Sequence, residues 1–208
     1  MIKLLISDLD DTLYDWTGFF VPAFYAMADE IARMTGIDEK KLLNEYMAAH
    51  QRLGSVEYPY ATLELPSIKA YYNNAPAEEL KAALRPAFNV FNSVRESHLH
   101  LLPGVEEMLR ALTEMGVTLI AYTESSKENG FYRLMKLGIE PYFKHVYTFE
   151  SQFKSAYAVS EKVRTVQTKK PDVAVIERIC AGEGYDKSEV MYLGDNLTKD
   201  MYLSLIHI

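Results

Sequence analysis

The chain has 208 residues, of which 49% are hydrophobic and 25% charged, a composition typical of a globular protein with one domain or one core and a modest insert. Its formal net charge of −7 argues against non-specific nucleic-acid binding. One cysteine excludes an intrachain disulfide, and the apolar runs are too short for a signal peptide or a membrane span. We therefore expect a cytoplasmic protein without nucleic-acid or membrane partners; the sequence does not predict its oligomeric state.

The first predicted element is a buried strand over residues 2–7 that ends in two carboxylates, Asp8 and Asp10. Because side chains alternate along extended backbone, these two should point the same way, with Cα atoms roughly 7 Å apart. That spacing suits one carboxylate that attacks an electrophile, a second that transfers a proton, and a metal ion shared between them. An acidic turn is the simpler alternative, since aspartate is common in turns.

Residues 15–98 are predicted to form an all-helical unit, because apolar residues recur there at helical spacing. Gly36 and Gly54 are typical of helix ends, and Asp38 can cap the helix that follows it. A proline-rich loop separates the first pair of helices from the second. The predicted helices are residues 17–35, 38–53, 66–73 and 76–97.

From residue 99 onward strands alternate with helices, which indicates a parallel sheet covered on both faces. Together, residues 1–14 and 99–208 should form a discontinuous Rossmann-like α/β core. Ligands bind such sheets beyond the carboxyl ends of the strands, where Asp8, Thr123 and Asp195 would lie. The predicted helices are 103–115, 126–137 and 171–181, the later strands are 117–122, 145–149 and 190–193, and segment 150–168 could be a helix, a hairpin or a loop.

Four short motifs follow one another along the chain. They are Asp8-x-Asp10, Thr123 at a strand end, Lys170-Pro171, and Gly194-Asp195 with Asp200. Each motif alone occurs by chance in many proteins, but the four in this order make a specific signal. Over essentially its whole length the sequence resembles the haloacid dehalogenase-like hydrolase superfamily, in its phosphatase branch with a helical cap inserted after the first motif.

The resemblance implies a role for each acidic residue. Asp8 would be the nucleophile that forms an aspartyl-phosphate, and Asp10 would protonate the leaving oxygen and later activate water. A Mg²⁺ ion would be bound by the carboxylates of Asp8 and Asp195 and by the backbone carbonyl of Asp10. Asp200 would orient the lysine or help hold the metal through water; a solvated turn aspartate is the alternative.

The resemblance also implies a phosphate-binding set. Thr123 would donate to a phosphoryl oxygen, together with the backbone N–H groups of Leu9 and Glu124. A lysine would offset charge on the phosphoryl group and on the nucleophile. Lys170, directly before a proline, best matches the family pattern, and Lys169 is the alternative.

The second aspartate of the first motif separates the reaction classes within the family. A dehalogenase has no alkoxide to protonate and lacks an acid there, so Asp10 favours phosphoester hydrolysis. An insert that acts as a lid suits a small phosphate monoester such as a sugar phosphate, a nucleotide or phosphoglycolate. A phosphomutase with the same groups and a non-catalytic binding module remain alternatives.

Family members normally continue with a further helix and strand after the fourth motif, whereas this chain stops eight residues after Asp200. We therefore expect the core to be truncated at the C-terminus. The last six residues, 203–208, also correspond to the reading of a common transposase-end sequencing adapter, and we hypothesise that they are not native. A stop codon directly after Ile208 in the genome would contradict this.

Overall fold

The computed structural model describes residues 1–58, 60–150 and 160–200. The chain divides into two compact units, an α/β unit of Met1–Trp16 with Leu99–Ile208 and a helical unit of Thr17–His98. Each unit is described by itself. The hypothesis about residues 203–208, and the middle of the ambiguous segment 150–168, lie outside the described residues.

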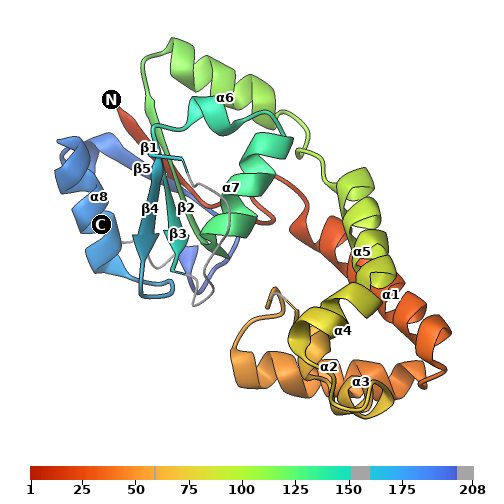
Figure 1. Cartoon of the computed structure of the whole chain (residues 1–208). Coiled ribbons are helices and arrows are strands. Elements are labelled where there is room, and N and C mark those ends of the chain that lie inside the picture. The colour runs from red at the N-terminus through yellow and green to blue at the C-terminus, as the bar shows by residue number, and fades with distance from the viewer. Residues whose placement is uncertain (59, 151–159, 201–208) are drawn as a thin grey trace. The chain divides into compact units, whose positions relative to one another are not determined.

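A five-stranded parallel sheet forms the centre of the α/β unit, with strand order β4-β3-β2-β1-β5 (Figure 1). Its strands are β1 (Leu4–Ser7), β2 (Thr118–Ser126), β3 (His145–Phe149), β4 (Val163–Val166) and β5 (Val190–Leu193). The central strand β1 pairs with β2 and β5, so that Ser7 lies opposite both Ala121 and Leu193. The carboxyl ends of β1 and β5 therefore lie side by side, whereas β2 continues from Ala121 to Ser126. The predicted parallel α/β architecture is confirmed.

Helices cover both faces of this sheet (Figure 1). They are α6 (Val105–Glu114), α7 (Lys127–Lys136) and α8 (Val173–Glu183), with short 3₁₀ turns at Glu140–Tyr142 and Lys187–Glu189. Leu4, Ile6 and Ile120 of the sheet pack against Ile176 and Ile179 of α8. Because strand side chains alternate, the intervening residues of β1 and β2 face the other side, where α6 and α7 lie against the sheet.

The helical unit has its own apolar core. Its elements are α1 (Trp16–Thr35), α2 (Glu39–Leu53), a 3₁₀ turn (Ala61–Glu64), α3 (Pro66–Tyr71), α4 (Ala77–Ala83) and α5 (Arg85–His98). Fully buried Ile31, Leu42 and Leu84 belong to this core. The prediction of one helix over 76–97 is wrong, because the chain breaks at Leu84; Pro86 lies in the first turn of α5, where a missing N–H breaks no helical hydrogen bond. Among the described residues, no helix has the length and apolar character needed to cross a membrane.

Candidate active site

Asp8 directly follows β1, and its backbone N–H donates to the carbonyl of Leu193 in β5 at 2.8 Å. The chain is thus held in the sheet up to the residue that carries the carboxylate. Burial raises the pKa of Asp8 to about 7, although the ammonium of Lys170 acts in the opposite direction. At neutral pH this carboxylate therefore needs further positive charge nearby to be fully ionised.

Lys170 is the cation beside Asp8. Its Nζ lies 2.7 Å from Asp8 Oδ1 and 3.0 Å from Asp200 Oδ1, and only 2% of its side chain is exposed. Lys169, the alternative considered from the sequence, instead places its Nζ 5.7 Å from the centre of the Phe149 ring. Of the two lysines, Lys170 is the one that meets the carboxylates.

The surroundings of Lys170 hold it in place. The rings of Tyr122 and Tyr192 lie 5.0 and 5.6 Å from its Nζ, within the range of cation–π attraction. Its backbone N–H donates to Glu124 Oε1 at 2.9 Å, and the other oxygen of Glu124 forms an ion pair with Lys199. The Glu124 side chain thus links the end of β2 to the segments that carry Lys170 and Asp200.

Asp195 and Asp200 follow β5 and come close to Asp8. The three residues offer carboxylate oxygens that all lie within 4.8 Å of one another. A Cβ on Gly194 would lie 2.4 Å from Cγ of Asp200, so only glycine lets the Asp200 side chain approach this turn. The backbone N–H of Asn196 donates to Asp200 Oδ2 at 3.1 Å and fixes the carboxylate there.

This cluster fits a magnesium ion. Three ionised carboxylates carry a charge of −3, and the ammonium of Lys170 offsets one unit of it, so a divalent cation would neutralise the remainder. The donor atoms are hard oxygens, which Mg²⁺ prefers. Asp8 and Asp195 were the carboxylate ligands expected from the sequence, and Asp200 lies close enough to contribute as well.

The carboxylate of Asp10 accepts hydrogen bonds on both oxygens. Oδ1 accepts from the hydroxyl of Tyr14 and from Nη1 of Arg133, each at 2.8 Å. Oδ2 accepts from the hydroxyls of Ser125 at 2.8 Å and Thr123 at 3.2 Å. The expected strand end at residue 122 is wrong, because β2 continues to Ser126 and Thr123 lies inside it. The Thr123 hydroxyl is directed at Asp10.

Asp8 and Asp10 face different partners. The extended conformation that places i and i+2 side chains on one face ends at Ser7, where β1 ends. The Leu9 carbonyl then accepts hydrogen bonds from the N–H groups three and four residues later, at 3.2 and 2.9 Å, and Asp11 adopts a left-handed φ of 55°. Asp8, which precedes this turn, contacts Lys170, whereas Asp10, which lies within it, contacts side chains of β2 and α7.

The sequence analysis missed Tyr14, Ser125 and Arg133 as partners of Asp10. Arg133 lies in the last turn of α7, where a basic residue favours the helix dipole and would be interpreted as surface-exposed. In the structure, only 4% of its side chain is exposed. Gly130 could have indicated that this part of α7 packs closely, because a glycine inside a helix often marks close contact with a neighbouring element.

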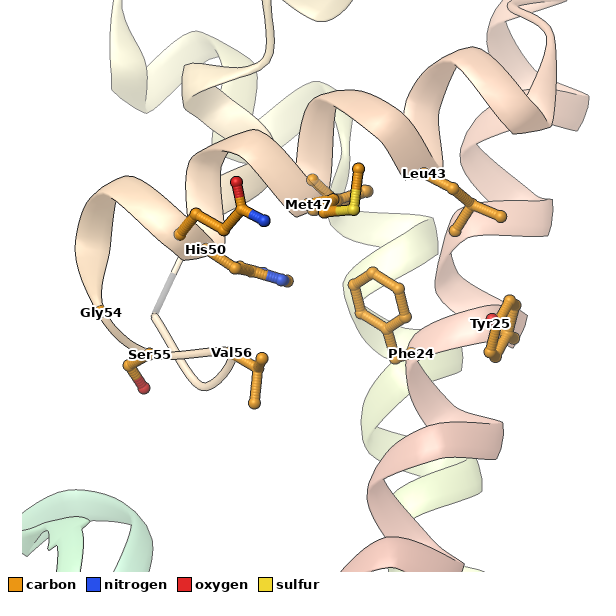
Figure 2. A pocket seen from close by; sticks show the side chains of 10 residues that line it. Phe24, Tyr25, Leu43, Met47, His50, Gly54, Ser55 and Val56 are labelled. Carbon is orange, nitrogen blue, oxygen red and sulfur yellow. The ribbon is translucent and has the colours of Figure 1, made fainter.

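A separate cavity of about 530 Å³ lies within the helical unit (Figure 2). Figure 2 shows Phe24, His50, Met47 and Val56 among the side chains that line it, and the ring centres of Phe24 and His50 are 5.7 Å apart. Burial lowers the pKa of His50. Among the described residues, its lining contains no acidic, lysine or arginine side chain.

The fold and these side chains define an α/β protein with acidic groups and a lysine at the end of its central strand. The chain belongs to the haloacid dehalogenase-like hydrolase family, which matches residues 2–202. It is 26% identical to glyceraldehyde 3-phosphate phosphatase of Pyrococcus abyssi over 97% of this chain and 76% of that protein. The protein of the same name from Methanopyrus kandleri is 28% identical over 97% of this chain and 78% of its own length.

Solved structures agree on the fold. The 2-haloacid dehalogenase of Pseudomonas syringae pv. Tomato DC3000 superposes with a TM-score of 0.65 at 23% identity. The similarity covers all of this chain and 84% of the dehalogenase. At this identity the likeness concerns architecture and does not extend to the reaction.

Proposed function

We propose that this protein is a magnesium-dependent phosphatase that hydrolyses a small phosphate monoester through an aspartyl-phosphate on Asp8. The observation that carries the proposal is the buried contact of Asp8 with Lys170, with the carboxylates of Asp195 and Asp200 gathered around it. The two relatives named glyceraldehyde 3-phosphate phosphatases support a small phosphorylated substrate. Family membership supports hydrolysis.

The proposed reaction has two displacements at phosphorus. In the first, an oxygen of Asp8 attacks the phosphorus atom, the bond to the leaving oxygen breaks, and Asp10, which must begin this step as the carboxylic acid, gives its proton to that oxygen and becomes a carboxylate. In the second, a water molecule attacks the aspartyl-phosphate while Asp10 accepts its proton. The bond between phosphorus and the Asp8 oxygen then breaks, which releases inorganic phosphate and restores the carboxylate.

Phosphoryl oxygens would be bound by donors near the carboxyl end of β1, beside Asp8. The Lys170 ammonium offsets the negative charge that the phosphoryl group brings to Asp8. The hydroxyl of Thr123 and the backbone N–H groups of Leu9 and Glu124 are the further donors that we propose. For Thr123 to serve in this way, its hydrogen must turn from Asp10 to the substrate.

The metal would be held by the carboxylates of Asp8 and Asp195 and by the backbone carbonyl of Asp10, with Asp200 in a supporting position. When bound, Mg²⁺ would supply positive charge that polarises the phosphoryl group and reduces the electrostatic repulsion between that group and the attacking carboxylate. The raised pKa of Asp8 supports this assignment, because a nearby cation favours the ionised nucleophile.

Asp10 favours a phosphatase over a dehalogenase. A phosphoester leaves as an alkoxide that needs a proton, and the protonated form of Asp10 would supply it. We also propose that the helical unit, Thr17–His98, is the cap that selects the substrate. Substitutions there should change kcat/KM for some esters more than for others, and equal losses on all esters would contradict this role.

The test measures phosphate release by the purified protein with Mg²⁺, using glyceraldehyde 3-phosphate, a sugar phosphate and a nucleoside monophosphate. We expect activity that EDTA abolishes and that Asp8→Asn lowers by at least about 10³-fold, because the nucleophile is removed. Asp38→Asn is the matched control. Asp38 caps α2 in the helical unit, and asparagine caps helices equally well.

Three results would contradict the proposal. Phosphate release that survives Asp8→Asn would show that Asp8 is not the nucleophile. Activity that is insensitive to EDTA would exclude the magnesium requirement. A phosphorylated isomer of the substrate, formed without free phosphate, would identify a phosphomutase.

A further inference from the structure

Arg133, Ser125 and Asp10 form a closed triangle of hydrogen bonds. Nη1 of Arg133 donates to Asp10 Oδ1 at 2.8 Å and to the Ser125 hydroxyl oxygen at 2.9 Å. The Ser125 hydroxyl in turn donates to Asp10 Oδ2 at 2.8 Å. Tyr14 adds a further donor to Oδ1 from the segment that precedes α1. The Asp10 carboxylate is therefore held by side chains of β2 and α7 and by Tyr14 of its own loop.

The close approach of α7 to the end of β2 brings Arg133 to this triangle. A Cβ on Gly130 would lie 3.2 Å from Cγ2 of Thr123 and 3.7 Å from Cβ of Ser125, so the first turns of α7 lie directly against these residues. Arg133 follows Gly130 by three positions and lies on the same face of the helix. The glycine thus sets the distance that the guanidinium has to span.

The guanidinium of Arg133 is buried, with 4% of its side chain exposed, whereas the carboxylate of Asp10 is 24% exposed. Burying a charge is costly unless it is paired, so Arg133 and Asp10 have few alternative arrangements. The Asp10 side chain therefore remains partly accessible while four donors hold its two oxygens. This is the geometry expected of a proton-transferring group that must face its substrate in one direction.

We propose that Arg133 is a positioning residue that, together with Ser125, fixes the direction in which the Asp10 carboxylate meets the leaving oxygen. This inference rests on the proposed function. Arg133 acts through Asp10 and does not itself contact the substrate. Removing it leaves the nucleophile and the lysine intact but lets the Asp10 carboxylate rotate away from the leaving group.

The identity of the leaving group provides the test. An aryl phosphate such as p-nitrophenyl phosphate leaves as a stable phenolate and needs little protonation, whereas an alkyl phosphate depends on the acid. For Arg133→Met we expect kcat/KM for glycerol 3-phosphate or glyceraldehyde 3-phosphate to fall by roughly 10- to 100-fold. We expect a fall of less than about threefold for the aryl ester, and partial recovery in Arg133→Lys.

Three further variants complete the test. Arg133→Met added to Asp10→Asn should cost little more than Asp10→Asn alone, because both changes remove one function. Arg110→Met, on the exposed face of α6, is the matched control and should leave both esters unchanged. Ser125→Ala keeps the buried Arg133–Asp10 pair, so it decides the question if Arg133→Met fails to fold; it should show the same preference for the aryl ester, more weakly.

Equal losses on both esters in a folded variant, or additive losses with Asp10→Asn, would overturn the positioning role while leaving the phosphatase proposal standing. A wild-type protein that releases phosphate from neither ester would overturn the phosphatase proposal and this inference with it. Melting temperatures of all variants separate unfolding from either outcome.

Discussion

Gly194 is a residue on which the whole acidic cluster depends. A methyl group there would lie 2.4 to 2.6 Å from Cβ, Cγ and Oδ2 of Asp200, and two of these atoms are too close to the backbone to move aside cheaply. Gly194→Ala should therefore displace Asp200 and, through the 3.0 Å contact, the ammonium of Lys170. We expect kcat for phosphate release to fall by about 100-fold, since small misplacements of catalytic groups have effects of this size.

Gly182 in α8 provides the control for this substitution. An added Cβ there meets nothing within 4 Å, so Gly182→Ala should leave kcat unchanged. It should also raise stability by up to about 1 kcal/mol, because alanine favours the helix. A Gly194→Ala protein that keeps kcat within about twofold of wild type would show that the Asp200 position is not critical.

At the scale of single residues, the sequence predicted the groups that lie directly after strands. Asp8 and Asp195 follow β1 and β5. The alternation of strands and helices predicted a parallel sheet, and this was enough to place both residues at the carboxyl ends of its strands. The partners of Asp10 could not be predicted, because they depend on how closely α7 packs against β2. Arg133 has the helical spacing and charge of an ordinary surface residue, and only its three-dimensional surroundings distinguish it.

At the scale of elements, Glu183 joins the end of α8 to β3. Its oxygens lie 2.6 Å from Nζ of Lys144 and 2.6 Å from Nδ1 of His145, and only 3% of its side chain is exposed. A carboxylate near a helix C-terminus is unfavourable by itself, so these partners are needed. Burial raises the pKa of Glu183, but the bonds to Lys144 and His145 outweigh it and hold the pKa below its ordinary value of 4.5.

Glu183→Gln should lower stability at pH 7 by about 1–2 kcal/mol, because two charge-assisted contacts are lost. A depressed pKa stabilises the folded state above about pH 4.5, and this contribution disappears as the pH falls through the folded-state value. Urea unfolding should therefore show a difference from wild type that shrinks as the pH falls below the ordinary pKa of 4.5. A difference that is constant with pH would contradict the electrostatic origin.

Glu177 on the same helix is the matched control. It forms an ion pair with Lys187 in which both side chains are about half exposed, at 51% and 48%. Exposed pairs contribute little, so Glu177→Gln should change stability by less than about 0.5 kcal/mol. An effect as large as that of Glu183→Gln would indicate that helix α8 responds to any lost charge.

The bounds of the elements were predictable where the end signals are strong. The side chain of Asp38 accepts a hydrogen bond from the Lys41 N–H, and Gly54 adopts the left-handed conformation after α2, close to the limits that the sequence predicts. Strand β4 was not identified, because only Val166 of its four residues is buried and its pairing with β3 depends on a distant segment. Alternation is too weak a signal in such a short edge strand.

At the scale of the whole molecule, one hydrophobic core of the helical unit and one of the α/β unit share no residue among the described parts of the chain. Leu42, fully buried, belongs to the core of the helical unit, and Ile179, also fully buried, belongs to the core between α8 and the sheet. Since each core is built within one compact unit, each unit has its own source of cooperative stability. Losses in one core should therefore be felt mainly within that unit.

Hydrogen exchange followed by mass spectrometry tests this independence. Leu42→Ala removes buried methyl groups and should cost about 2–5 kcal/mol, which speeds amide exchange in residues 17–98 and leaves 105–149 nearly unchanged. Ile179→Ala should produce the converse pattern at a similar cost. If either variant speeds exchange equally throughout the chain, the two cores unfold as one cooperative unit. Separate responses would mean that the helical unit can loosen while the sheet that carries Asp8 stays folded.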